Sequence, residues 1–351
     1  MLFELSLSIS SSPLFLMEIE LSSLFPDVLK AHILTRLDGP SLAALASVSS
    51  EMNSATSDEK LWQNICRSMW PSVSDQRVHS FISTLPSGYR SFFYHSYPTL
   101  LQTFGCTAAP LTSPSSLISA VDIYYRGNAI LSRVVEIEIQ SQWFRNAPFS
   151  VDVVKPPPPP PQQPDFTETR RIEEDDKWLK DMRDNISLSW IMFGPEEKKA
   201  VNLSSHRPVV TERHWLTDEV QMKFSVVMHG GRRFRGTVKE CVECSVTVTC
   251  DEKGDGTVNV ISVCMSMEDL EGKVLRGEET VEFFRSAVEN GRRQRRENDE
   301  DGAQAKALFQ KLHRRRIEWW SKKHKRQQAV DLAVIFVGVT IFMLWCYMKI
   351  L

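Results

Sequence analysis

Cysteine is scarce in this sequence. Seven cysteines are scattered over 351 residues, and their number is odd. Small secreted domains that rely on disulfide bonds are much richer in cysteine and usually carry an even number. We therefore expect no disulfide framework, and a chain that resides in a reducing compartment.

The sequence also lacks the motifs of common enzyme chemistry. It has no Walker loop, no GxSxG nucleophile elbow and no HExxH zinc motif. Cys241 and Cys244 form a CxxC pair, with Cys250 and Cys264 downstream. Cys244 and Cys250 fall on one face of a predicted strand and Cys241 on the other, which does not suit a single zinc ion. We predict a non-enzymatic protein with no catalytic residues, no metal and no cofactor.

A large excess of one sign of charge is missing from the chain as a whole. The formal net charge is −2, yet residues 292–326 hold thirteen Lys and Arg against five Asp and Glu. That segment therefore carries +8 (13 − 5), and the rest of the chain carries about −10. Because the positive charge is confined to one segment, we look for a local reason for it.

Alternation of apolar and polar residues predicts β-strands in the middle of the chain. Every even position in 220–228 is apolar, and a similar alternation covers 241–250 and 131–139. The turn-forming segment Asp251–Gly256 separates the second of these from the alternating residues 257–265, which predicts a hairpin. No long helical pattern separates the strands, so we expect an antiparallel, sandwich-like arrangement.

Two segments are predicted to lack regular structure. The first twenty residues contain no Lys or Arg, and Glu4 and several serines interrupt their apolar run, so we interpret 1–20 as a disordered leader and not as a signal peptide. Six consecutive prolines, Pro156–Pro161, favour a polyproline II stretch. We interpret residues 155–177 as a solvated insertion between strands, with a docking site for a proline-binding module as the alternative.

Residues 24–70 predict three short helices. Pro26 suits the first position of a helix, and Asp38-Gly39-Pro40 ends that helix. Asp58 can cap a third helix, which Pro71 ends. About 45 residues cannot bury all the large apolar side chains of these helices among themselves, so the rest of the chain or a partner is expected to cover the surplus.

The same residues resemble the F-box motif. The family usually has a tryptophan where this chain has Met52, and because methionine fills irregular gaps we expect weaker but retained packing there. The matching strings are FPDVL at 25–29, IL at 33–34, RLD at 36–38, SL at 41–42, VS at 48–49 and LW at 61–62.

Further strings resemble a plant group of F-box proteins, without implying a particular target. They are SAVDIYYRG at 119–127, SLSW at 187–190, AVNLSSHRPV at 200–209 and RHWLT at 213–217.

The resemblance implies a partner and a mechanism. F-box proteins dock onto a Skp-type adaptor, which links them to a cullin and a ubiquitin-charged enzyme, and they raise the effective concentration of a target lysine without contributing a reacting group. The candidate residues that face the adaptor or support that face are Pro26, Leu29, Ile33, Leu34, Leu37, Leu42, Leu45, Val48, Leu61 and Trp62.

An uncharged run of seventeen residues, 332–348, predicts a transmembrane helix near the C-terminus. At about 1.5 Å per residue it spans roughly 26 Å, close to the thin hydrocarbon core of the endoplasmic reticulum. Trp345 and Tyr347 suit a membrane interface. A buried core helix is the alternative, but core helices rarely run this far without a charge.

The segment before this run is strongly basic, with eight Lys and Arg against Glu318 in 311–326. Such a cluster is expected on the cytosolic side of a membrane helix and is attracted to anionic lipids. Nuclear import or nucleic-acid contact are the alternatives. Because Trp319 and Trp320 precede an apolar helix, we favour the membrane and predict no nucleic-acid partner. We expect a single-pass, tail-anchored protein with a cytosolic N-terminus, the endoplasmic reticulum being favoured.

These patterns together predict an α+β protein that recruits an unknown protein target to an SCF-type ubiquitin ligase. The alternative is a membrane-anchored lectin-like or scaffold protein acting outside the ubiquitin system. The predicted parts are a leader (1–20), a three-helix F-box (21–70), a helical connector (71–116), a β-rich target-binding domain (117–285), a basic amphipathic helix (286–328) and a transmembrane helix (329–348).

Overall fold

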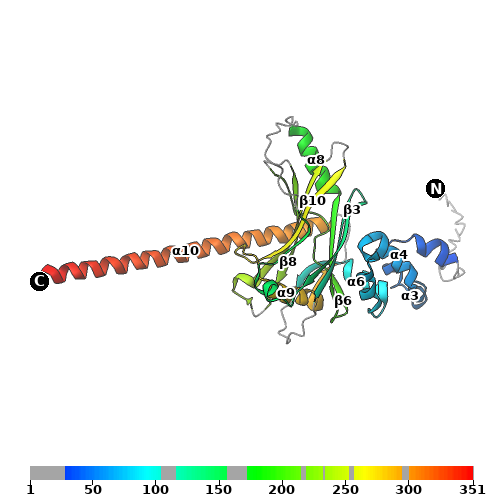
Figure 1. Ribbon diagram of the computed structural model, residues 1–351, viewed down its shortest axis with the longest axis horizontal. Helices are drawn as coiled ribbons and strands as arrows, with labels where there is room; N and C mark the ends of the chain where they lie inside the picture. Colours follow the sequence, from blue (N-terminus) through cyan, green and yellow to red (C-terminus); the bar gives the residue numbers. More distant parts are fainter. Residues whose placement is uncertain are drawn as a thin grey trace, which may run out of the picture. The chain divides into compact units, whose positions relative to one another are not determined.

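The computed structural model describes most of the chain and divides it into two compact units, Met1–Ile65 and Cys66–Leu351 (Figure 1). The predicted leader, Pro26, the proline tract, residues 253–256 of the predicted hairpin turn and residues 215–217 of RHWLT lie outside the described residues. The described residues are 28–103, 116–155, 172–214, 219–231, 234–252, 257–294 and 300–350.

The first unit is helical. A helical segment made of η2 and η3 is followed by α2, whose N-cap Asp38 accepts a hydrogen bond from Ser41 N at 3.0 Å. Ser49 caps a further helix by accepting from Met52 N at 3.2 Å, so the described residues of the unit, 28 onward, form one more short helix than predicted. The elements are η2 (Leu29–Ile33), η3 (Leu34–Arg36), α2 (Gly39–Leu45), α3 (Ser50–Ala55) and α4 (Glu59–Met69), within which the unit boundary falls.

The helical connector begins the second unit. The sequence predicts helix around 78–97, and the structure breaks it at 84–87, where Pro86 lies between two helices. Trp70 packs edge-on against Phe92 with ring centroids 5.5 Å apart, and Phe92 in turn stacks on Phe193 of a β-strand at 6.0 Å. These rings fasten the connector to the sheet that follows. The connector helices are η4 (Pro71–Ser74), α5 (Gln76–Ser83) and α6 (Gly88–Ser96).

Two antiparallel sheets form the centre of the second unit, which confirms the predicted α+β class. One has four strands in the order β3-β2-β5-β6, and its first hairpin turns through Arg126 and Gly127, whose φ angles of 49° and 78° suit a two-residue loop. Its strands are β2 (Ser116–Tyr125), β3 (Asn128–Glu138), β5 (Ile186–Gly194) and β6 (Lys199–Asn202).

The other sheet has five strands in the order β4-β10-β9-β8-β7. It contains the strands predicted at 220–228 and 241–250, and β9 and β10 pair as the predicted hairpin. A separate two-stranded sheet joins β1 (Thr99–Thr103) to β11 (Gly291–Gln294). The five strands are β4 (Ser150–Val154), β7 (Val210–Arg213), β8 (Val220–His229), β9 (Cys241–Glu252) and β10 (Val258–Glu268).

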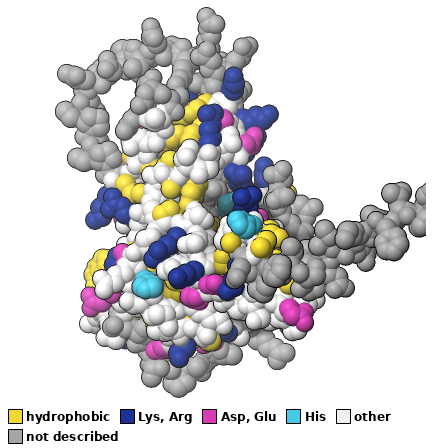
Figure 2. All heavy atoms as spheres, turned by 90° about the vertical axis from the view of Figure 1, so that its right-hand side faces the viewer, with side chains coloured by type: hydrophobic (Ala, Val, Ile, Leu, Met, Phe, Trp, Pro, Cys, Tyr) yellow, Lys and Arg dark blue, Asp and Glu magenta, His cyan; other side chains and the backbone are white. Residues whose placement is uncertain are grey.

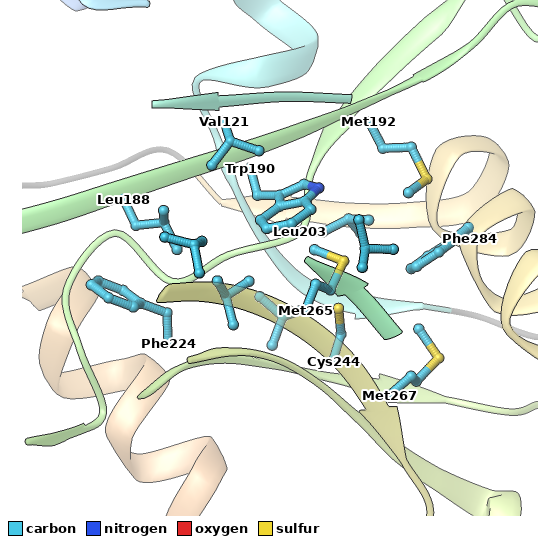
Figure 3. Close-up of a cluster of buried hydrophobic side chains, with 14 of the residues drawn as sticks. Val121, Leu188, Trp190, Met192, Leu203, Phe224, Cys244, Met265, Met267 and Phe284 are labelled. Carbon is cyan, nitrogen blue, oxygen red and sulfur yellow. The ribbon is translucent and has the colours of Figure 1, made fainter. Parts of the chain in front are cut away.

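Both sheets contribute to one hydrophobic core. Figure 3 shows Trp190 of β5 in the same cluster as Cys244 of β9 and Met265 of β10, with Phe284 from a helix beside them. All of these side chains are buried, so their removal from water is the main stabilising contribution. The apolar face predicted for 220–228 points into this core as Val220, Met222, Phe224, Val226 and Met228.

The segment 200–209, one of the strings that resemble a plant group of F-box proteins, connects the two sheets. Asn202 Oδ1 accepts from Trp190 N at 3.2 Å, in the four-stranded sheet. Ser205 Oγ accepts from Ser225 N at 3.0 Å, and Val209 N donates to Lys223 O at 2.8 Å, both in the five-stranded sheet. The string therefore has a structural role, because its polar groups satisfy backbone groups of both sheets.

Several helices lie between the strands, and the expectation that no long helix separates them is wrong. α8 contacts the hydrophobic core through Trp178, Leu179 and Met182. α9 contacts it through residues that include Phe283 and Phe284, which are buried. α10 is one continuous helix where the sequence analysis expected two. The elements are α7 (Gln142–Asn146), α8 (Ile172–Asn185), η6 (Val238–Glu240), α9 (Gly277–Asn290) and α10 (Glu300–Ile350).

A buried carboxylate links the connector to the four-stranded sheet. Asp122 of β2 is fully buried and accepts hydrogen bonds from Ser72 N at 3.0 Å, from Ser132 Oγ at 2.7 Å and from Ser72 Oγ. Burial raises the pKa of Asp122, and these hydrogen bonds offset part of that shift. The carboxylate thus joins η4, β2 and β3.

We predict that Asp122→Ala lowers the free energy of unfolding by about 2–3 kcal/mol, because Ser72 N loses its buried acceptor. Asp122→Asn should cost less than about 1 kcal/mol, since the amide keeps one acceptor and the Ser72 hydroxyl can reverse its role. Urea denaturation of the full chain in detergent, followed by tryptophan fluorescence, measures both. Equal losses in the two variants would contradict a hydrogen-bonding role.

Candidate binding surfaces

The helices of the first unit are held together by a buried tryptophan. Trp62 Nε1 donates to Thr56 O at 2.7 Å, and Thr56 Oγ1 donates to Met52 O at 2.8 Å. Trp62, Thr56 and Met52 are all buried. The chain of hydrogen bonds fixes the start of α4 against the end of α3, and Met52 retains its packed position as expected.

Asp58 caps the N-terminal end of α4. Its carboxylate caps the helix by accepting from Lys60 N at 3.0 Å, and it forms an ion pair with Lys30 at 3.3 Å. The hydrogen bond from Lys60 N–H and the nearby Lys30 lower the pKa of Asp58, against a smaller effect of burial. Because both side chains of the ion pair are partly exposed, the pair orients η2 more than it stabilises it.

The ten predicted adaptor residues do not share one environment. Leu29, Leu34, Leu42, Leu61 and Trp62 are buried, which suits a supporting role within the helices. Ile33, Leu37 and Leu45 are partly exposed, and Val48 is 73% exposed, while Pro26 lies outside the described residues.

Val28, which the sequence analysis left out of that set, is also 41% exposed. Its place in the matching string FPDVL at 25–29 was the signal that could have included it. On the face shown in Figure 2, hydrophobic side chains reach the surface among Lys and Arg side chains. A surface of this kind suits binding to another protein. Which residues touch an adaptor stays a prediction.

In the second unit, the first half of α10 covers the outer face of the five-stranded sheet. Leu312 is buried in a small cluster with Val227, Cys241 and Leu270, and Leu308 and Trp319 pack against it. Leu308, Leu312 and Trp319 are spaced by four and seven positions, one and two helical turns, so they share one face of the helix. The contact ends near Lys323, which pairs with Glu271 at 2.9 Å.

A buried charge lies under this part of α10. The side chain of Glu243 on β9 is fully buried, and its two oxygens lie 2.9 Å from Lys223 Nζ and 2.9 Å from Arg316 Nη1. Arg316 also pairs with Glu268 at 3.2 Å. An ionised carboxylate is costly to bury without such partners, so the position of Arg316 beside Glu243 offsets part of the cost of burying that charge.

The second half of α10 has a different character. Its large apolar side chains are exposed, for example Leu332 at 72% and Met348 at 73%. The helix is long and apolar enough to cross a membrane, and its most apolar stretch makes no buried contact. The predicted apolar helix therefore exists, although it continues the basic helix without a break.

The basic residues before the apolar run divide into two groups, a division the sequence analysis did not make. Arg316 pairs with Glu243 of the sheet, Lys323 pairs with Glu271 in the turn after β10, and Arg315 Nη1 lies 2.8 Å from Cys241 Sγ. The others that the sequence analysis assigned to lipid are exposed, namely Lys311, Arg314, Lys322, Lys325 and Arg326.

No group of three or more His, Cys, Asp or Glu residues that could hold a metal ion occurs in the described part of the chain. Cys244 and Cys250 face the hydrophobic core, whereas Cys241 lies on the opposite face under α10. Burial raises the pKa of the Cys244 thiol. The three thiols therefore lie on two opposite faces of β9, as the alternation of the sequence predicted.

Comparisons with known proteins agree with the N-terminal geometry. The F-box-like family profile matches residues 23–68. F-box protein At2g27310 of Arabidopsis thaliana is 36% identical over 332 residues, covering 93% of this chain and 96% of the relative. F-box protein At3g44326 of Arabidopsis thaliana is 38% identical over 331 residues, covering 92% and 89%. A third, "Probable F-box protein At2g36090" of the same plant, is 34% identical over 335 residues, covering 93% and 94%. No solved structure matches this chain.

We predict that Arg316→Ala releases the first half of α10 from the sheet, because Glu243 would keep Lys223 as its single cation. Breaking a buried ion pair costs about 3 kcal/mol or more, so amide hydrogen exchange in 305–323 should accelerate by two orders of magnitude or more. Arg314→Ala, on an exposed position of the same helix, is the matched control and should leave exchange unchanged. Similar exchange in both variants would show that Arg316 is dispensable for docking.

Proposed function

The chain belongs to the F-box protein family, whose members serve as substrate-recognition adaptors of SCF ubiquitin ligases, and from this premise we propose that it recruits its target at the cytosolic face of a membrane. The observation that carries the membrane part of the proposal is the exposed apolar half of α10. The target is a protein held by the β-rich domain, and the chemistry is performed by the ubiquitin-charged enzyme.

The F-box domain supports binding to a Skp-type adaptor and, through it, to a cullin. In our proposal, Val48 and the partly exposed Ile33, Leu37 and Leu45 contact the adaptor directly. The buried Leu34, together with Leu29, Leu42, Leu61 and Trp62, holds the helices in position. Apolar helix faces that enter a partner's groove commonly draw most of their binding energy from a few such anchors.

The membrane part rests on the length and surroundings of the apolar run. Leu332–Met348 contains no charged residue, which matches a span of about 26 Å in a thin bilayer. The cations that precede it favour the cytosolic side for the β-rich domain and the N-terminus. We propose a single pass as a tail anchor, with the endoplasmic reticulum as the favoured membrane.

Val48→Asp should weaken capture of a Skp-type adaptor by more than tenfold, because a charge on an apolar contact must be desolvated on binding. The folded state should be unaffected, since Val48 is 73% exposed. Affinity capture with purified adaptor measures the effect, and the Pro26→Ala/Leu37→Ala double variant should bind weakly as well.

Ser54→Asp is the control for this experiment, since it adds the same charge to an exposed position of α3. It should bind like the wild type. Full binding by Val48→Asp would exclude Val48 from the interface, and absence of binding by the wild type would favour an F-box that works outside the ubiquitin system.

The full chain, synthesised with microsomes, should resist alkaline extraction, and removal of residues 329–351 should abolish this resistance. A glycosylation tripeptide added after Leu351 should receive sugar, whereas Asn185 of the natural tripeptide Asn185-Ile-Ser187 should not. Asn202 is less informative, because it is fully buried and folding itself excludes a glycan there. Sugar on Asn185 would invert the proposed topology.

A further inference from the structure

The exposed cations of α10 are not equally placed with respect to the apolar run. Between Trp319 and Leu332 the helix carries Lys322, Lys323, Lys325 and Arg326, with Asp331 as the one acidic residue. Lys323, whose side chain is 51% exposed, pairs at 2.9 Å with Glu271 in the turn that follows β10. The other three cations are exposed.

Helix geometry decides how close these charges come to a bilayer. At about 1.5 Å per residue, Arg326 lies about 9 Å and Lys322 about 15 Å before the start of the uncharged run. The headgroup region is roughly 5–8 Å deep on each side, and long cationic side chains extend along the helix toward a polar surface. Arg326 and Lys325 therefore reach the headgroups, and Lys322 comes within about one Debye length of them.

The exposed cations farther from the run are too distant. Arg314 lies about 27 Å before Leu332, and Lys311 and Lys306 lie farther still. At this separation salt screens the attraction between an exposed side chain and a charged surface. Apart from Arg315 and Lys323, which contact Cys241 and Glu271, the same helix thus contains a near set and a far set of three exposed cations each, with equal charge.

On the basis of the proposed membrane function, we propose that Lys322, Lys325 and Arg326 form a binding site for the anionic headgroups of cytosolic-leaflet lipids. The site is close to the apolar run, and Lys325 and Arg326 are the only Lys or Arg residues between Lys323 and Leu332 in the sequence. Phosphate and carboxylate groups of lipids such as phosphatidylserine supply the complementary charge. Lys323 forms an ion pair with Glu271, in the turn that follows β10. Lipid binding by Lys322, Lys325 and Arg326 therefore places this turn next to the headgroup layer.

The test uses the full chain, synthesised without cells in the presence of vesicles and separated by flotation. One set of vesicles is phosphatidylcholine, and the other is phosphatidylcholine with phosphatidylserine at about 7:3. Wild-type chain should associate with the anionic vesicles at least tenfold faster at low salt, and high salt should remove the difference. The near-set variant K322Q/K325Q/R326Q should associate with both vesicles at the slower rate.

The far-set variant K306Q/K311Q/R314Q removes the same charge and should keep the preference of the wild type. The inference is overturned if the wild type shows no lipid preference, or if the far-set variant loses it equally. It is also overturned if short duplex DNA prevents flotation of the wild type but not of the near-set variant, since Lys322, Lys325 and Arg326 would then bind nucleic acid. Failure of the wild type to float with either vesicle would instead refute the proposed membrane attachment itself.

Discussion

The arrangement of the second unit depends on one buried carboxylate. Glu243 lies near the start of β9, on the face opposite the hydrophobic core, and it is shielded from water by α10. Lys223 pairs with one oxygen of this buried carboxylate, and the other oxygen requires a second cation, which α10 supplies as Arg316. That requirement fixes the rotation of α10 about its axis. Once Arg316 and Leu312 face the sheet, Arg314 must face away from it. The same rotation determines the directions of the exposed cations before the apolar run.

Much of the fold could be predicted because the β-strands have one buried face each. The alternating valines of β9 and the even positions of β8 face the core, so their period of two is visible in the sequence. α8 was missed because most of its residues are charged or polar; among the side chains described in 177–185, Trp178, Leu179 and Met182 are those that pack in the core. α9 was missed although Val281, Phe284 and Val288 recur at helical spacing, since the strand pattern around it was given priority.

The functional residues were harder to separate than the fold. Internal packing and docking onto a partner both select apolar side chains, so the F-box pattern cannot by itself distinguish buried Leu42 from exposed Val48. The basic segment posed the same difficulty. Lys322 and Lys323 are neighbours of identical type, and only the position of Glu271, in the turn after β10, shows which of the two forms an ion pair.

The helix α10 runs without interruption from the sheet to the end of the apolar run, and no proline or glycine occurs between Trp319 and Leu332. In a bilayer, such a continuous connection would confine the recognition domain to a thin layer above the lipid and leave it free to diffuse in two dimensions. The local concentration of proteins anchored in the same membrane is then raised relative to soluble ones. Selection among targets would begin with their distance from the bilayer, before any contact with a recognition surface.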